Sequence, residues 1–313
     1  MINKKTLLGM IAVCSACLFV SCSDDDDNGG SAPKSPVTTF SGKLLAQSGN
    51  YKYMYDEYGR CYKIDTGYDG IYDIDYDKGV MTIEDEQENA KISFNGKGYI
   101  TCIASSWDYS SDKGSGKVTF SYDGDGHLTA EESSYSGMET QGNKKYNYSE
   151  TFKSIHTWKN GNLIKTVSSD TWNEDGKIET EEDTYTVEYG NVKNVTEQIT
   201  FAISDALDHD LYESLAMIGL LGKGTAFLPT TVIIEDSETW YDQPMRSTRN
   251  ASYYLNNDGT INSENYYGTR NYTYVTIDPD SDRKKTSVIK APWQNNDKKL
   301  RMKDFFVRNR NRK

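Results

Sequence analysis

The stretch Lys117-Val118-Thr119-Phe120-Ser121-Tyr122, followed by Asp123-Gly124-Asp125-Gly126-His127-Leu128, contains the pattern that decides the fold. In its first half apolar and polar residues alternate, which is typical of a β-strand with one buried face. In its second half Asp and Gly supply the positive φ angles of a tight turn, and an aromatic and an aliphatic residue flank that turn. The stretch therefore predicts a strand that leads into a β-hairpin.

The same unit recurs along the chain: an aromatic residue, about three polar residues, a glycine, one further residue and then an apolar one. The copies are Tyr55…Gly59-Arg60-Cys61, Tyr76…Gly79-Val80-Met81, Phe94…Gly98-Tyr99-Ile100, Tyr122…Gly126-His127-Leu128, Trp158…Gly161-Asn162-Leu163, Trp172…Gly176-Lys177-Ile178 and Tyr253…Gly259-Thr260-Ile261, with a tighter relative at Tyr189-Gly190-Asn191-Val192. Each copy predicts a hairpin turn between antiparallel strands. The repeat therefore predicts a mainly β fold, an antiparallel hairpin meander that forms a curved sheet or a partly closed barrel.

One segment departs from this pattern, at residues 204–221. Leu207, Leu211, Leu215 and Ile218 are spaced to share one helical face, and Ser204 is a suitable N-cap. We expect one inserted α-helix that closes an end of the sheet or covers one of its faces.

The N-terminus has the layout of a secretory signal peptide, with Lys4 and Lys5 before an apolar run that ends at Val20. That run is shorter than the roughly 20 apolar residues that cross a bilayer. Cleavage before Cys22 resembles the bacterial lipobox, in which the cysteine is acylated, for instance with palmitate, and becomes the new N-terminus. The alternative is a fortuitous cysteine at the end of an ordinary secretion signal.

Four aspartates follow this cysteine in the run Ser23-Asp24-Asp25-Asp26-Asp27. The run resembles the export signal that sends Bacteroidota lipoproteins to the outer face of the outer membrane, and it is equally a solvated linker. The predicted organisation has four parts. These are a signal peptide at 1–21, an acidic and flexible tether at 22–36, a single β-meander domain at 37–278, and a basic C-terminal tail at 279–313.

Charge is distributed unevenly along the chain. The net charge is −12, yet residues 283–313 contain twelve Lys or Arg and two acids, which leaves −22 for residues 1–282. An acidic body is a poor nucleic-acid binder, because affinity for phosphates depends on Lys and Arg. The tail is expected to be solvated or disordered, with contact to an anionic surface as the alternative.

Two cysteines, Cys61 and Cys102, remain in the predicted domain. A disulfide between them is permitted outside the cytoplasm. Both occupy apolar positions near the repeat, so two buried thiols are the alternative.

A weak calcium candidate is formed by Asp73, Asp75, Asp77 and Glu84, which imitate the ligand spacing of a calcium loop. Tyr and Ile alternate with the aspartates, as they would on a strand with a wet face. The strand is the preferred interpretation, and no metal is predicted.

The sequence lacks the common zinc-protease, serine-hydrolase and phosphate-loop motifs. His127, His156 and His209 are scattered and are interpreted as surface or packing residues. With 47 acids in the chain, finding an Asp/Glu pair suited to glycoside hydrolysis is uninformative. The repeat assigns many of the tyrosines and tryptophans to cross-strand packing, which is favoured over sugar stacking. No catalytic residue and no cofactor is predicted.

The elements Leu220-Leu221-Gly222-Lys223 and Leu228-Pro229, followed by strands with Tyr-x-x-x-Asp-Gly-x-Ile turns, support a resemblance. The stretch from Phe40 to Ile277 resembles a family of Bacteroidota lipoproteins catalogued as a domain of unknown function with a porin-like fold. The resemblance implies a fold and a location but no catalytic residues. The basic tail departs from the family pattern.

A spanning barrel needs an apolar outer band, whereas many strands here place polar residues opposite the aromatics. We therefore expect a soluble sheet or partial barrel with its aromatic face inward. The predicted function is that of a surface-exposed outer-membrane lipoprotein, a non-catalytic binding or envelope-structural module whose ligand would be a glycan or another surface molecule. The alternatives are an extracellular glycan-degrading enzyme that uses an Asp/Glu pair, and a relative of the tyrosine-aspartate repeats of toxin-encasing shells.

Overall fold

The computed structural model describes residues 42–56, 58–67, 70–83, 88–109, 111–208, 212–239 and 244–276. The strands are β1 Lys43–Ser48, β2 Tyr51–Tyr55, β3 Cys61–Asp65, β4 Ile71–Asp75, β5 Val80–Ile83, β6 Glu88–Phe94, β7 Ile100–Asp108, β8 Asp112–Tyr122, β9 Leu128–Gln141, β10 Lys144–Lys159, β11 Asn162–Glu174, β12 Lys177–Lys193, β13 Phe227–Thr239, β14 Pro244–Asn250, β15 Ser252–Leu255, β16 Ile261–Asn265 and β17 Thr269–Thr276. Two helices, α1 Phe201–Ala206 and α2 Glu213–Met217, lie between β12 and β13.

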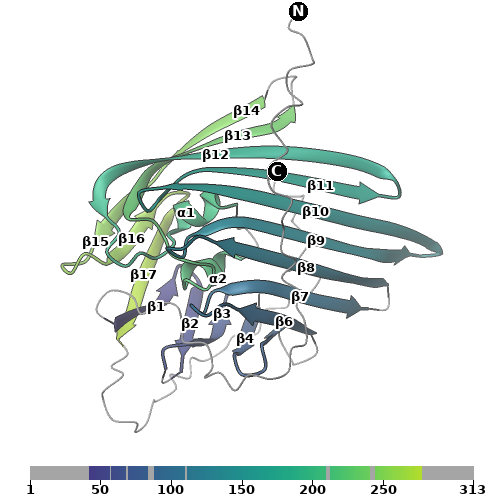
Figure 1. Ribbon diagram of the computed structural model, residues 1–313, viewed down its shortest axis with the longest axis horizontal. Coiled ribbons are helices and arrows are strands. Elements are labelled where there is room, and N and C mark those ends of the chain that lie inside the picture. The colour runs from purple at the N-terminus through teal and green to yellow at the C-terminus, as the bar shows by residue number, and fades with distance from the viewer. Residues whose placement is uncertain are drawn as a thin grey trace, which may run out of the picture. The chain divides into compact units, whose positions relative to one another are not determined.

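The strands form a nearly closed antiparallel barrel, as the sequence predicts (Figure 1). Each strand from β1 to β14 pairs with the next along the chain. β15, β16 and β17 continue the meander, and β17 returns to β1 with Ser48 opposite Tyr272. β14 and β15 are separated only by Ala251, and in the described residues β14 pairs with β13 while β15 pairs with β16. The ring is therefore interrupted at this one bend.

The strands alternate between an inner and an outer face, and β10 shows the contrast most clearly. Glu150, Phe152, Ser154 and His156 are buried, whereas Thr151, Lys153, Ile155 and Thr157 between them are exposed. Strand β12 follows the same pattern, with Tyr185 and Val187 buried and Glu182, Thr186 and Glu188 exposed. The aromatic face is therefore inward, and the outer face of the long strands is mainly polar.

The repeated unit forms turns between neighbouring strands, most of them at one rim of this barrel, whereas the copy at Gly176, between β11 and β12, lies at the opposite end of the strands. The glycine has a positive φ in seven of its eight copies, namely Gly59, Gly79, Gly98, Gly126, Gly161, Gly176 and Gly259. The prediction of a turn at Gly190 was wrong, because this glycine lies within β12. Its flanking residues Tyr189 and Val192 belong to one continuous strand, and the local motif lacks the Asp-Gly or Asn-Gly pair that turns the chain.

The prediction of one helix over 204–221 needs correction, because the segment contains two short helices. Thr200, not Ser204, caps α1 by accepting a hydrogen bond from the Ile203 N–H at 3.3 Å. The backbone leaves the helical conformation at Asp208, where φ is +60°. Leu207, Leu215 and Ile218 are buried as predicted, whereas Leu211 lies outside the described residues. Within the part of the chain that the structure describes, neither helix has the length and apolar character needed to cross a membrane.

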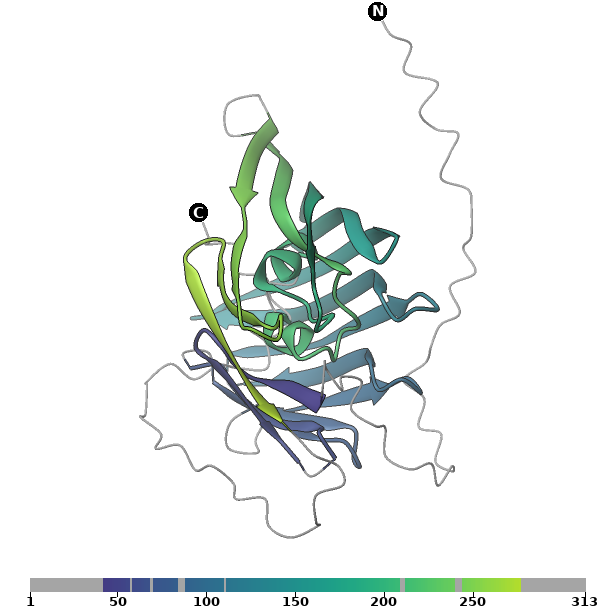
Figure 2. The same ribbon diagram turned by 90° about the vertical axis from the view of Figure 1, so that its left-hand side faces the viewer.

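The two helices lie within the ring of strands and form what we call the helical plug, α1 and α2 (Figure 2). The connection around them is bonded to the rim turns. The Lys223 N–H donates to the Gly126 carbonyl at 2.9 Å, and the Ala226 N–H donates to the Gly161 carbonyl at 2.8 Å. The hairpin turns thus fix the chain that carries the plug.

A buried carboxylate, Glu264 of β16, holds the first turn of α1. It is 1% exposed and accepts the backbone N–H groups of Phe201 and Ala202, each at 2.9 Å. The hydroxyl of Tyr253 donates to it at 3.2 Å, and the hydroxyl of Tyr272 donates to its other oxygen. One carboxylate therefore satisfies two of the N–H groups that a helix leaves unpaired at its start.

Two ion pairs fix the plug at other points. Arg249 of β14 binds both oxygens of Asp205 in α1 at 2.8 and 2.9 Å, and the Tyr266 hydroxyl donates to the same carboxylate at 2.5 Å. Arg270 of β17 binds Glu213 of α2. The Arg270 guanidinium also lies 3.8 Å from the centre of the Phe201 ring, a cation–π contact that connects the two helices through one side chain.

A second set of contacts stabilises the long strands β7 to β10, where β8 and β9 each contribute a glycine. Trp107, Gly114, Gly137 and Tyr148 lie opposite one another across β7, β8, β9 and β10. The two aromatic rings cover the two glycines. Trp107 Nε1–H and the Tyr148 hydroxyl both donate to the buried carboxylate of Asp112, at 3.2 and 2.7 Å. The space that the glycines leave is therefore filled by aromatic side chains.

We expect Glu264→Ala to lower the free energy of unfolding by about 3 kcal/mol or more, because it leaves buried donors unsatisfied. Chemical denaturation measures this loss, with the exposed Glu188→Gln as the control. Burial raises the pKa of Glu264, and the hydrogen bonds it accepts act in the opposite direction.

A raised pKa means that the folded state binds this proton more tightly than the unfolded state. The stabilising contribution of protonation is therefore present at low pH and is lost as pH rises through the folded-state pKa. Wild type should gain stability relative to Glu264→Gln when pH falls from about 7 to about 5. Parallel curves for the two proteins would contradict the assignment.

Gly114→Ala should destabilise the protein by about 1–3 kcal/mol through overpacking. The added Cβ would lie 2.5 Å from the Trp107 ring and 2.6 Å from the Ser136 carbonyl oxygen. Gly96→Ala is the matched control, because no atom lies within 4 Å of the added Cβ there. Equal denaturation midpoints for the two variants would show that the ring does not pack on Gly114.

Candidate functional site

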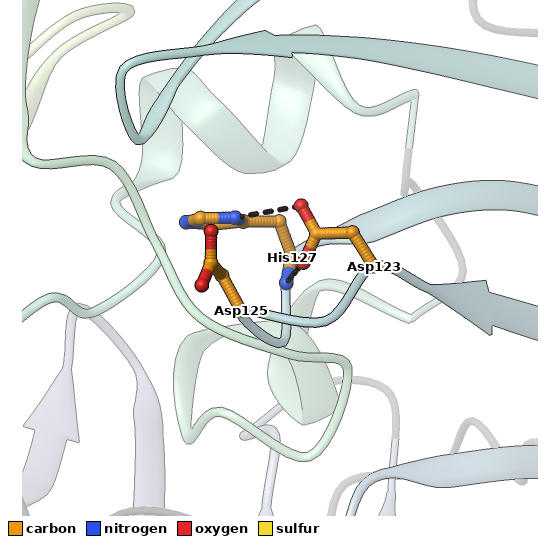
Figure 3. Close-up of side chains that lie close together, drawn as sticks. All are labelled: Asp123, Asp125 and His127. Atoms are coloured by element: carbon orange, nitrogen blue, oxygen red, sulfur yellow. Dashed lines mark hydrogen bonds and ion pairs between the residues drawn. The ribbon is translucent and has the colours of Figure 1, made fainter.

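The turn between β8 and β9 brings together Asp123, Asp125 and His127 (Figure 3). The Asp123 N–H donates to the His127 carbonyl at 3.0 Å, which closes the turn. One carboxylate oxygen of Asp123 accepts the N–H groups of Gly126 and His127 at 2.8 and 2.9 Å. The Asp-Gly pattern of the repeat thus folds into a turn that its own aspartate locks.

The imidazole of His127 is fixed from two sides. Its Nδ1 lies 3.0 Å from the second carboxylate oxygen of Asp123, and its ring stacks on Trp158 with 4.4 Å between ring centres. Burial tends to raise the pKa of Asp123, but the hydrogen bonds from the backbone and ring of His127 lower it overall. Asp123 is therefore held as a carboxylate, and His127 is a buried packing residue, in line with the sequence interpretation.

Two carboxylates and an imidazole form a donor set suited to a divalent transition metal. One ligand atom from each of the three residues lies within 4.8 Å of the others. However, both oxygens of Asp123 already accept hydrogen bonds from the turn. These hydrogen bonds give the three residues a structural role: they hold the turn between β8 and β9 at the rim of the barrel.

A second acidic group lies on the inner face of the long strands, where three rows of cross-strand neighbours carry seven carboxylates. The first row is Glu131, Ser154, Ser168, Asp183 and Asp236, the second is Ser133, Phe152, Asp170 and Glu181, and the third is Tyr135, Glu150, Trp172 and Glu179. We call the carboxylates of these rows, Glu131, Glu150, Asp170, Glu179, Glu181, Asp183 and Asp236, the acidic inner face. Phe152 and Tyr135 are buried, which identifies this side of the sheet as the inner one.

Some of these acids have neutral partners within their own rows. The Tyr135 hydroxyl donates to Glu150, and Trp172 Nε1 donates to Glu179 at 3.1 Å. Glu181, Asp183 and Asp236 form a tighter group, in which one oxygen of each lies within 4.8 Å of the others. Sequence reasoning missed this face. The available signal was the alternation of Glu179, Glu181 and Asp183 in step with the buried Tyr185 and Val187.

The predicted calcium candidates lie on and beside β4 and are not brought together. Asp73 pairs with Lys63 at 3.1 Å, Asp75 pairs with Lys78 at 2.9 Å, and Asp77 lies 3.7 Å from Arg60. Asp75 also accepts the N–H groups of the following turn, and these contacts lower its pKa, with Lys78 as the main cause. The arrangement is that of a strand and its turn, and Glu84 lies outside the described residues.

The sequence leaves open a disulfide between Cys61 and Cys102 or two buried thiols, and Cys61 is a free thiol, 2% exposed. Burial raises its pKa to about 12, so the thiol is protonated and unreactive at neutral pH. Cys61 and Cys102 are therefore not bonded to each other. For Cys61 the alternative of a buried thiol holds, because its side chain belongs to the core.

Of the other residues singled out in the sequence, His156 lies in the core and the rest lie outside the described residues. His156 is 4% exposed on β10 and bonds the hydroxyls of Ser154 and Thr166, so it is a satisfied core histidine. His209, the lipidation residue Cys22 and the export signal Ser23, Asp24, Asp25, Asp26 and Asp27 lie outside the described residues.

Among solved structures, the chain is similar to two porin-like proteins. One, from Bacteroides uniformis, is 19% identical, with 78% of this chain and 98% of that chain covered and a TM-score of 0.47. The other, from Bacteroides vulgatus, is 13% identical, with 76% and 99% covered and a TM-score of 0.48. No family model matches the chain, and no curated protein matches it. Both neighbours are called porin-like, and membership of the family of unknown function stays a prediction.

We expect Asp123→Ala to lower the free energy of unfolding by about 1–3 kcal/mol, because it removes the acceptor for the buried turn. Asp125→Ala, at an exposed position of the same turn, should change it by less than about 0.5 kcal/mol. Thermal melts with zinc and with chelator should coincide. A zinc-dependent increase in midpoint that Asp125→Ala abolishes would instead identify a metal site.

Proposed function

We propose that this chain is a lipid-anchored protein of the outer membrane, exposed at the cell surface, that acts as a non-catalytic binding or envelope-structural module. The observation that carries the proposal is the sidedness of the long strands. A barrel embedded in lipid turns an apolar band outward. Here the outward positions of β10 include Thr151, Lys153 and Thr157, and the aromatic residues face inward.

The N-terminal sequence supports the anchor. The apolar run ends at Val20, shortly before Cys22, and the sequence predicts a polar tether of 15 residues at 22–36. Such a tether spans about 20 Å as a flexible coil. Because the outer face of the described long strands is mainly polar, an anchor of this kind would hold the barrel at a membrane.

The use of the buried carboxylates supports a structural or binding role over catalysis. Glu264 and Asp205 bind the helical plug, and Asp123 locks a rim turn. Each of these acids is engaged by backbone N–H groups, tyrosines or arginines. Their role in the fold is to stabilise helices and turns.

Protease treatment of intact cells tests the proposed location at the cell surface. Wild type should be degraded from outside, and Cys22→Ser should leave the membrane fraction while folding normally. Protection of wild type in intact cells, with degradation only after lysis, would contradict surface exposure. A Cys22→Ser protein that stays membrane-bound and needs detergent would contradict the anchor.

A glycan array with the folded protein separates binding from a purely structural role. Reproducible turnover of a surface glycan by the purified protein would overturn the non-catalytic assignment and favour the glycan-degrading enzyme. Loss of that turnover in a variant with two facing acids removed would then be required.

A further inference from the structure

The outer face of strands β4 to β10 contains a long groove of about 1480 Å³, which we call the outer groove. It follows a row of cross-strand neighbours on β5 to β10, namely Val80, Lys91, Ala104, Lys117, Ser134 and Thr151. Each of these residues is exposed or half-buried and has a buried neighbour along its strand, which identifies this side of the sheet as the outer one.

The size of the outer groove favours an extended ligand. A pocket for a small molecule usually has roughly 300–1000 Å³, and the outer groove is larger. A second hollow of about 670 Å³ adjoins it near the turn between β11 and β12, and Ser136 and Ser149 line both. A polymer that crosses the strands therefore finds a continuous hollow from β5 to β11.

Small hydroxyl side chains line the middle of this hollow. Ser106, Ser115, Ser136 and Ser149 are successive cross-strand neighbours on β7 to β10. The hydroxyls of Ser115, Ser136 and Ser149 form no hydrogen bond with another described residue. Each of them can donate and accept, and neighbouring strands place them about 4.8 Å apart. Such a row suits a ligand that carries hydroxyl groups along its length, as a carbohydrate chain does.

The charges in the outer groove favour an anionic ligand at its centre. The aspartates at its β4 end all pair with lysine or arginine. Lys117, by contrast, forms no ion pair with another part of the described chain. It is half-buried, between Ala104 and Ser134 in the row and two residues from Ser115 along β8. One positive charge without a protein counterion therefore lies beside the row of serine hydroxyls.

We propose that the outer groove binds a linear anionic glycan, one whose sugars carry carboxylate or sulfate groups. This inference depends on the binding role proposed above and gives that role a site. The glycan lies across β7 to β10, where its hydroxyl groups bond the serine row. One of its acidic groups pairs with the Lys117 ammonium.

Two other classes of ligand fit the outer groove less well. The centre of a protein interface is usually rich in aromatic and large apolar side chains, whereas Val80 and Ala104 are the apolar residues among the outward-facing lining of β5 to β10. A nucleic acid needs several Lys or Arg contacts to its phosphates. A single unpaired lysine on a chain of net charge −12 does not supply them.

Isothermal titration of the full chain with Cys22→Ser tests the proposal. The probes are polygalacturonate, which carries carboxylates, dextran sulfate, which carries sulfates, and neutral dextran. We expect binding of at least one anionic polymer and none of dextran. Because an ion pair contributes, the affinity should fall as the salt concentration rises.

Two pairs of variants locate the binding site. Lys117→Gln should weaken binding by about threefold to tenfold. Lys165→Gln, at an exposed and unpaired lysine on the outer face of β11, should leave it unchanged. Ser136→Trp places a bulky ring where the two hollows meet and should abolish binding, whereas Thr157→Trp, at an exposed position of β10 outside them, should not. Circular dichroism and thermal melts confirm that all four variants fold.

Three results would overturn the proposal. If wild type binds neither anionic polymer, the outer groove is not an anionic glycan site, and the proposed structural role and cell-surface location stand as before. If binding is the same in wild type, Lys117→Gln and Ser136→Trp, the protein is a glycan binder with its site elsewhere. If dextran binds as tightly as dextran sulfate and only Ser136→Trp abolishes binding, the groove takes a neutral glycan.

Discussion

The arrangement of this barrel depends on the hydrogen bonds between the Glu264 carboxylate and the start of α1. Glu264 lies on a short strand near the end of the chain and binds the first backbone N–H groups of α1. The helices are too short to be stable alone, because isolated helices need about 12–15 residues even in favourable sequences. Their stability therefore comes from tertiary contacts, and Glu264, Asp205 and Glu213 provide the polar part of these. The apolar part comes from a core shared by both helices and the inner side of the sheet.

This construction explains why one rim differs from the rest of the interior. At the rim, repeated Asp- or Asn-containing turns bind the connection that carries the plug, and the interior is aromatic and aliphatic. Farther along the long strands the same inner face becomes acidic, with opposed carboxylates on β11, β12 and β13. The barrel is thus apolar where its own helices fill it and charged where they do not.

Much of the fold could be predicted from local sequence, because its elements are local. An Asp-Gly turn such as that before His127 depends on neighbouring residues, and the alternation along β10 and β12 is visible in the sequence. The broken helix could not be predicted, since Leu207, Leu215 and Ile218 fit a single helical face equally well. What breaks it is the left-handed backbone at Asp208 and burial on all sides. Glu264 was missed because its partner Ala202 is 62 residues away, and a carboxylate among 47 acids carries no signal by itself.

Amide hydrogen exchange of Phe201, Ala202 and the residues of α2 tests most directly whether the plug is an integral part of the barrel. If Glu264 and the two arginine pairs hold it as described, these amides exchange only through global unfolding, with the same free energy as the amides of β10 and β11. Exchange of the plug at a much lower free energy than that of the strands would contradict this account, because it would identify the helices as an independently opening segment.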